Sequence, residues 1–188
     1  MVKRVGPLRL CFLDALPISG RGVRGVALVT DARTVPVELR ITDPLTPTRM
    51  QRAAYGVAFD EHALLDLVAV PLLRALREEI SLLLVRSSRL LRVQERVEAP
   101  VLWVGRQEDL IPIPDAEEPG FLLAARDERF PPVIALGYHG RHEETRSACE
   151  VLQRVLQRSD PLEPFARLQL AIEQLVAKDA SHGVPEPS

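Results

Sequence analysis

The stretch "SLLLVRSSRLLRVQERVEAPVLWV", residues 81–104, decides the fold. Its opening "SLLLV" is too short and too apolar to be anything but a buried strand. A short amphipathic helix follows, with Ser87 or Ser88 as its N-cap, and residues 100–104 form the next buried strand. Since a strand, a helix and a strand in this order form a right-handed crossover, we predict two parallel strands here.

Three further strands precede this unit. Residues 8–16 and 25–31 are apolar enough for buried strands, and residues 35–42 alternate apolar with polar side chains. Their short connections favour antiparallel hairpins. Helical spacing begins at Thr46, and a second helix starts near Asp60 with an apolar stripe along one side.

The whole chain of 188 residues suits one domain. We predict an α/β core over residues 1–105 and a proline-rich acidic loop over 106–119. Residues 120–178 contain a strand pair and two helices that we expect to pack on the same core. Residues 179–188 have little to bury and are expected to be a disordered tail.

The order βββαβαβ resembles the ribonuclease-H-like fold. This resemblance is one of topology, and no sequence motif accompanies it. It implies an α/β protein with a mixed five-stranded sheet, to which the C-terminal strand pair and two helices are added.

A glycine fingerprint, G-x-G-x-x-G, lies at Gly20, Gly22 and Gly25. A dinucleotide-binding turn needs a helix directly after the last glycine, so that backbone amides face the pyrophosphate. Here a β-type run, Val-Ala-Leu-Val, follows instead. We therefore interpret the glycines as turn residues that supply positive φ between two strands, and we expect no bound dinucleotide.

Asp14 is a carboxylate inside an apolar strand, where it needs a partner, water or a metal. The resemblance implies a role for it, since a first-strand aspartate in this fold holds catalytic Mg²⁺ together with carboxylates from other elements. A second carboxylate is expected where the fourth strand ends, but the sequence has Arg86 there. The structural alternative is that Asp14 lies at the strand's solvated end and bonds to nearby backbone or to Arg9.

Four acids elsewhere in the chain could join Asp14 in a catalytic or metal site, although nothing in the sequence places them beside it. They are Asp60, Glu61, Glu143 and Glu144. A separate candidate for anion binding is the segment "GYHGRHEET", residues 137–145, which leads from a strand into a helix. Its candidate ligands are His139, Arg141 and His142.

Composition restricts the remaining classes. Residues 1–52 carry nine basic and four acidic groups, although the whole chain has a formal net charge of −2. This basic third would suit a phosphate-bearing or acidic partner. The two cysteines, Cys11 and Cys149, lie in apolar patterns and are expected to be buried and reduced in a cytoplasmic protein. No apolar run is long enough to span a membrane.

Two functional interpretations remain. The main one is a non-catalytic binding or interaction module, which binds a protein partner or forms a homo-oligomer, because no catalytic constellation is complete. The alternative is a ribonuclease-H-like nuclease that binds nucleic acid and cleaves phosphodiesters with Mg²⁺ or Mn²⁺. We expect no cofactor other than that metal.

Overall fold

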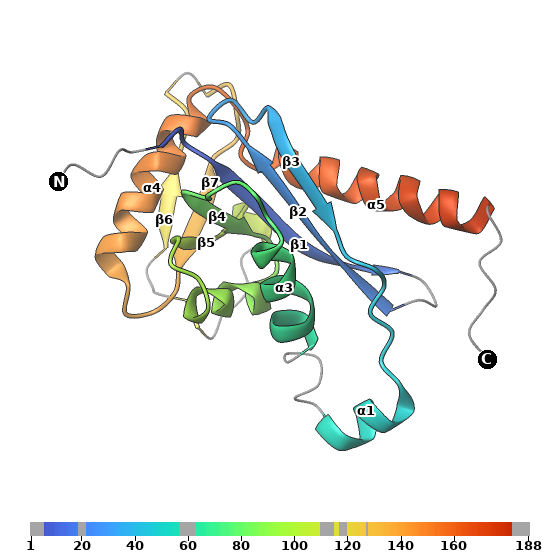
Figure 1. Ribbon diagram of the computed structural model, residues 1–188. Coiled ribbons are helices and arrows are strands. Elements are labelled where there is room, and N and C mark those ends of the chain that lie inside the picture. The colour runs from blue at the N-terminus through green and yellow to red at the C-terminus, as the bar shows by residue number, and fades with distance from the viewer. Residues whose placement is uncertain are drawn as a thin grey trace.

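A computed structural model describes residues 6–18, 22–56, 63–109, 115–116, 120–126 and 128–181 (Figure 1). The elements, in chain order, are β1 (Leu10–Ile18), β2 (Gly22–Thr30), β3 (Pro36–Ile41), α1 (Arg49–Tyr55), η1 (Ala63–Ala69), α3 (Val70–Arg74), β4 (Leu82–Val85), η2 (Ser88–Glu95), β5 (Val101–Gly105), η3 (Gln107–Asp109), β6 (Phe121–Leu123), β7 (Val133–Gly137), α4 (His142–Leu156) and α5 (Glu163–Ser181).

All seven described strands form one mixed sheet in the order β3-β2-β1-β4-β5-β7-β6. β1 pairs parallel with β4, and β4 pairs parallel with β5, as the crossover predicts. The other neighbours are antiparallel, so the sheet is mostly antiparallel. The prediction of an α/β class is confirmed, but the five-stranded count is wrong. The C-terminal pair continues the sheet because β7 bonds to the open backbone edge of β5.

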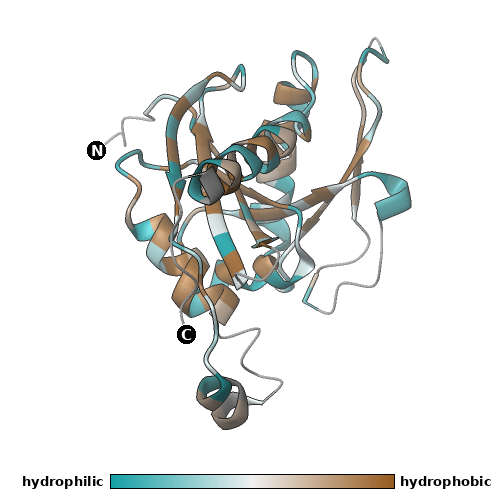
Figure 2. Cartoon of the chain, turned by 90° about the vertical axis from the view of Figure 1, so that its right-hand side faces the viewer, coloured by the Kyte–Doolittle hydropathy of each residue, from teal (hydrophilic) through white to brown (hydrophobic). Residues whose placement is uncertain are grey.

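Helices cover both faces of the sheet (Figure 1). On one face, α4 and α5 pack against a core that includes Phe12 and Leu84, and Phe165 of α5 meets the Phe12 ring edge-on at 5.4 Å between centroids. On the other face, η1, α3 and η2 pack against Leu13 and Val85. Apolar residues therefore run through the strands between two helical layers (Figure 2).

The glycine fingerprint divides into two structural roles. Gly22 has φ +85° at the start of β2, which confirms that it is a turn glycine. Gly25 lies inside β2, where the lack of a side chain matters for packing. A Cβ at this position would approach Cγ1 of Val68 to 2.3 Å. Gly20 lies outside the described residues.

Local chain signals were partly misread. The helix α1 begins at Arg49, three residues after the helical spacing that starts at Thr46, and its cap is Thr48, whose Oγ1 accepts from the backbone N of Gln51 at 3.2 Å. Ser87 stands at the N-cap of η2, but its side chain makes no capping hydrogen bond. The helix α5 continues to Ser181, so the predicted tail begins too early. Its remaining residues, 182–188, lie outside the described part of the chain.

No helix in the described residues is long and apolar enough to cross a membrane. Cys11 and Cys149 are buried and unpaired, as expected. Burial raises the pKa of the Cys149 thiol to about 12 and that of Cys11 further still. Both thiols are therefore protonated and unreactive in the folded protein.

The close contact at Gly25 generates a stability prediction. Gly25→Ala places a methyl group against Val68, which is 1% exposed and cannot move away freely. We expect a loss of about 1–3 kcal/mol in the free energy of unfolding, measured by urea denaturation. Gly6→Ala is the matched control, since nothing lies within 4 Å of the added atom. Equal stability of the two variants would contradict this packing.

Candidate functional site at the carboxyl edge of the parallel strands

The carboxyl ends of β1, β4 and β5 meet at one edge of the sheet. Leu13 is in register with Val85, and Val85 is in register with Trp103. Arg86 directly follows Val85, the last residue of β4. Asp14 follows Leu13 in β1, so its side chain points to the opposite face of the sheet from that of Leu13. This is the face that α4 and α5 cover, because Phe12 and Leu84 belong to that core.

The helix α5 passes over the stretch of β1 that contains Asp14. Near its start Phe165 packs on Phe12. Near its end Asp179 accepts from Nη2 of Arg24 at 2.7 Å, and Arg24 stands opposite Leu16 in the β1–β2 ladder. Asp14 lies between these two anchor points and is therefore partly covered.

Asp14 is half-buried and bonds to its own backbone. Its Oδ1 accepts from the Ala15 N–H at 2.8 Å. Burial raises the pKa of the Asp14 carboxyl, while the Ala15 N–H and the charge of Arg86 act in the opposite direction. The predicted partner Arg9 instead forms an ion pair with Glu78 at 2.6 Å. Of the two partners that the structural alternative named, Asp14 has the nearby backbone and not Arg9.

Arg86 is held at the end of β4 by two contacts. Its Nη2 donates to Oδ2 of Asp109 at 2.9 Å, and the indole N–H of Trp103 donates to its backbone carbonyl at 2.7 Å. The same Asp109 oxygen accepts from the backbone N of Arg106. Sequence reasoning registered Arg86 only as a missing carboxylate and overlooked Asp109. The sequence feature that could have identified Arg86 is its position, because it is a charged residue directly after the buried strand β4.

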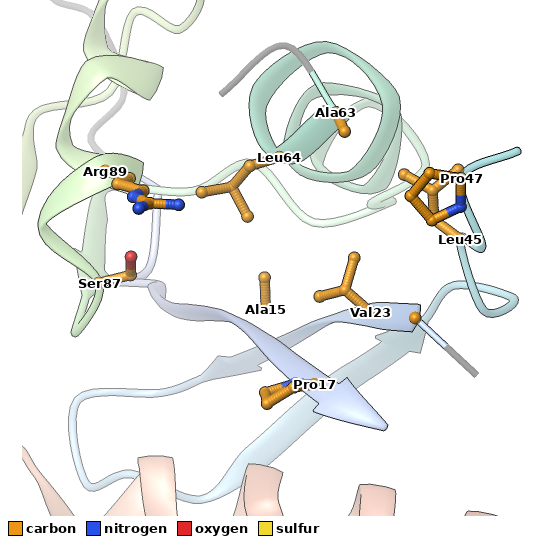
Figure 3. Close-up of a pocket in the computed structure, with 10 residues that line it drawn as sticks. Ala15, Pro17, Val23, Leu45, Pro47, Ala63, Leu64, Ser87 and Arg89 are labelled. Atoms are coloured by element: carbon orange, nitrogen blue, oxygen red, sulfur yellow. The ribbon is translucent and has the colours of Figure 1, made fainter. Parts of the chain in front are cut away.

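A cavity of about 450 Å³ lies at the same edge on the other face of the sheet (Figure 3). Ala15 and Val23 form its floor, and Leu64 of η1 faces them from the opposite wall (Figure 3). Ser87 and Arg89 stand together on one side and supply its polar groups (Figure 3). Among the described residues that line it, the cavity thus combines apolar walls with one hydroxyl and one guanidinium.

The other predicted acids do not join Asp14 in the described part of the chain. Glu143 and Glu144 line a different cavity with Leu82 and Pro100, at the amino ends of β4 and β5. This is the opposite edge of the sheet from Asp14. Two further candidates, Asp60 and Glu61, lie outside the described residues.

The predicted anion site also lies at that opposite edge, because Gly137 at the end of β7 pairs with Leu102 near the start of β5. Arg141 is engaged by Glu144 at 2.7 Å. The ring of His139 stacks on Tyr138 at 4.6 Å, and His142 contacts Arg146 at 3.2 Å. The three candidate ligands are therefore engaged locally and do not converge on one point.

The residues that the structure describes do not form a metal site. They include no group of three or more histidine, cysteine or acidic side chains that could hold an ion. At the carboxyl edge, the guanidinium of Arg86 is a charged neighbour of Asp14 and forms an ion pair with Asp109. Among the described residues this edge thus offers one carboxylate outside an ion pair, that of Asp14, and Mg²⁺ is commonly held by one or two carboxylates together with water and substrate phosphates.

Among solved structures, the chain is similar to endonuclease V from Bacillus subtilis, with a TM-score of 0.57 and 14% sequence identity, over 95% of this chain and 84% of that chain. It is also similar to human ENDOV, with a TM-score of 0.60 and 15% identity, over 94% and 87% of the two chains. No protein-family model and no curated protein sequence matches it. The likeness shows the fold, a mixed α/β sheet arranged as in endonuclease V.

This finding contradicts our main functional expectation. We expected a non-catalytic binding module because the fourth strand ends without a carboxylate. The two solved structures named above, which share the fold over nearly the whole chain, are endonucleases, and this favours the nuclease alternative.

The raised pKa of Asp14 predicts a pH-dependent stability. Folding favours the protonated carboxyl, so Asp14 lowers stability as pH rises through its unfolded pKa of about 3.9 toward the higher folded value. In metal-free buffer, Asp14→Asn should therefore stabilise the protein at about pH 7 and have little effect at about pH 3.5. The asparagine oxygen can still accept from Ala15. Urea unfolding across this range is the measurement, and a stability difference independent of pH would contradict the prediction.

Proposed function

We propose that this protein is a divalent-metal-dependent nuclease that cleaves phosphodiester bonds in nucleic acid. The observation that carries the proposal is the half-buried carboxylate of Asp14 on a central strand of an endonuclease V-like sheet. A carboxylate that folding has partly desolvated gains more than an exposed one from a bound cation.

The proposal assigns Mg²⁺ or Mn²⁺ as the metal and Asp14 as its first ligand. Since the described residues supply only this acid, we assign the other ligands to Asp60 and Glu61. Carboxylate oxygens are the ligands that both ions prefer.

The cavity at this edge suits a segment of a nucleic acid chain. Its apolar walls, which include Val23 and Leu64, would accept a base or a sugar. The guanidinium of Arg89 on its polar side matches the geometry of a phosphate, and the hydroxyl of Ser87 beside it can donate a further hydrogen bond.

An activity assay tests the proposal. Labelled single- and double-stranded DNA and RNA are incubated with the protein in Mg²⁺, Mn²⁺ or EDTA. We expect metal-dependent cleavage that Asp14→Asn lowers at least about 100-fold, because it removes a metal ligand. The double variant Asp60→Asn/Glu61→Gln should lower it similarly. Mn²⁺ should also raise the melting temperature of the wild-type protein but not that of Asp14→Asn.

Glu143→Gln is the matched control. It removes an acid of the same kind at the opposite edge of the sheet, so cleavage should continue at the wild-type rate. Absence of cleavage of every substrate by the wild-type protein, with no Mn²⁺-dependent change in melting temperature, would overturn the proposal.

A further inference from the structure

Arg86 occupies the strand end beside Asp14, at the centre of the sheet. It follows Val85, the last residue of β4, and β4 lies between β1 and β5. Asp14 and Arg86 each come one residue after the paired positions Leu13 and Val85. Asp14 and Arg86 are thus neighbouring positions at this edge of the sheet, and the charge of Arg86 lowers the pKa of Asp14 against the effect of burial.

The guanidinium of Arg86 is fixed but not fully engaged. Asp109 Oδ2 is its one acceptor among the described residues, and the Arg86 side chain keeps 34% of its surface exposed. The Trp103 indole holds the backbone of Arg86 at the same time. An arginine has five N–H donors in a rigid fork, so the ion pair leaves donors that can reach a ligand from solvent.

Arg106, which follows the neighbouring strand β5, provides a contrast. Its guanidinium donates to the carbonyls of Pro131 and Pro132 and to Oδ2 of Asp160, at 2.6 to 3.2 Å. These contacts join the end of β5 to the segments before β7 and α5. Arg106 therefore has a structural role, whereas Arg86 has a single side-chain partner among the described residues and keeps part of its guanidinium exposed.

We propose that Arg86 binds a phosphate group of the nucleic acid directly, as a fixed cation beside Asp14. The inference rests on the proposed function and names a substrate-binding residue for it. A guanidinium presents paired donors to phosphate oxygens and stays charged at every physiological pH. Arg86 consequently supplies positive charge at this edge before any metal binds, and nucleic acid binding does not require a divalent ion.

Binding assays in EDTA test this inference separately from cleavage. Fluorescence anisotropy with a short single-stranded DNA and an RNA of the same sequence would compare wild type, Arg86→Gln and Arg86→Lys. Arg86→Gln should weaken binding about tenfold, and the slope of log K against log salt should fall by about one phosphate contact. Arg86→Lys should keep the salt slope but lose part of the affinity, because lysine lacks the paired donors.

Arg141→Gln is the control for general loss of positive charge. Arg141 is also a half-exposed arginine in an ion pair, but it lies at the opposite edge of the sheet, so its replacement should leave binding unchanged. Melting curves verify that each variant is folded. Equal losses in Arg86→Gln and Arg141→Gln, or no binding by the wild type in EDTA, would overturn the inference. Neither result bears on metal-dependent cleavage, which the activity assay decides.

Discussion

The parallel pairing of β1 with β4 is the constraint on which the rest of the structure depends. It inserts a buried strand beside the first strand of an antiparallel meander, and it brings the carboxyl ends of β1, β4 and β5 to one edge. All four residues of β4, Leu82–Val85, are buried because helices cover both faces. Burial of these aliphatic side chains provides the main stabilisation of the arrangement.

Ion pairs around this edge determine how α5 lies over Asp14. Asp160, which precedes α5, accepts from Arg106 at the end of β5, and Asp179 near its C-terminus accepts from Arg24 of β2. The Arg24 side chain is only 8% exposed, and its Nε atom has no hydrogen-bond partner in the part of the chain that the structure describes. A buried pair of this kind adds little net stability, but it penalises other orientations of the helix, which would leave the arginine unpaired.

Local patterns in the sequence were sufficient for much of the fold. The apolar runs around Leu10, Leu82 and Val101 predict buried strands. Such runs are too short for a helix, and a strand that is covered on both faces has apolar side chains at every position. The turn before α5 is also local, because Oδ1 of Asp160 accepts from the backbone N of Leu162, two residues further on. The number of strands in the sheet was not predictable, because whether β7 pairs with β5 depends on contacts distant in the sequence.

The sequence by itself determined the α/β class, the parallel crossover and the unusual position of Asp14, since each follows from the order of side chains along one segment. Only the tertiary structure decided that Arg86 lies next to Asp14, that Asp109 holds it, and that Glu143 belongs to the opposite edge. Strand register and the packing of α5 set these distances. Both arise from interactions between segments up to 155 residues apart, and no local pattern encodes them.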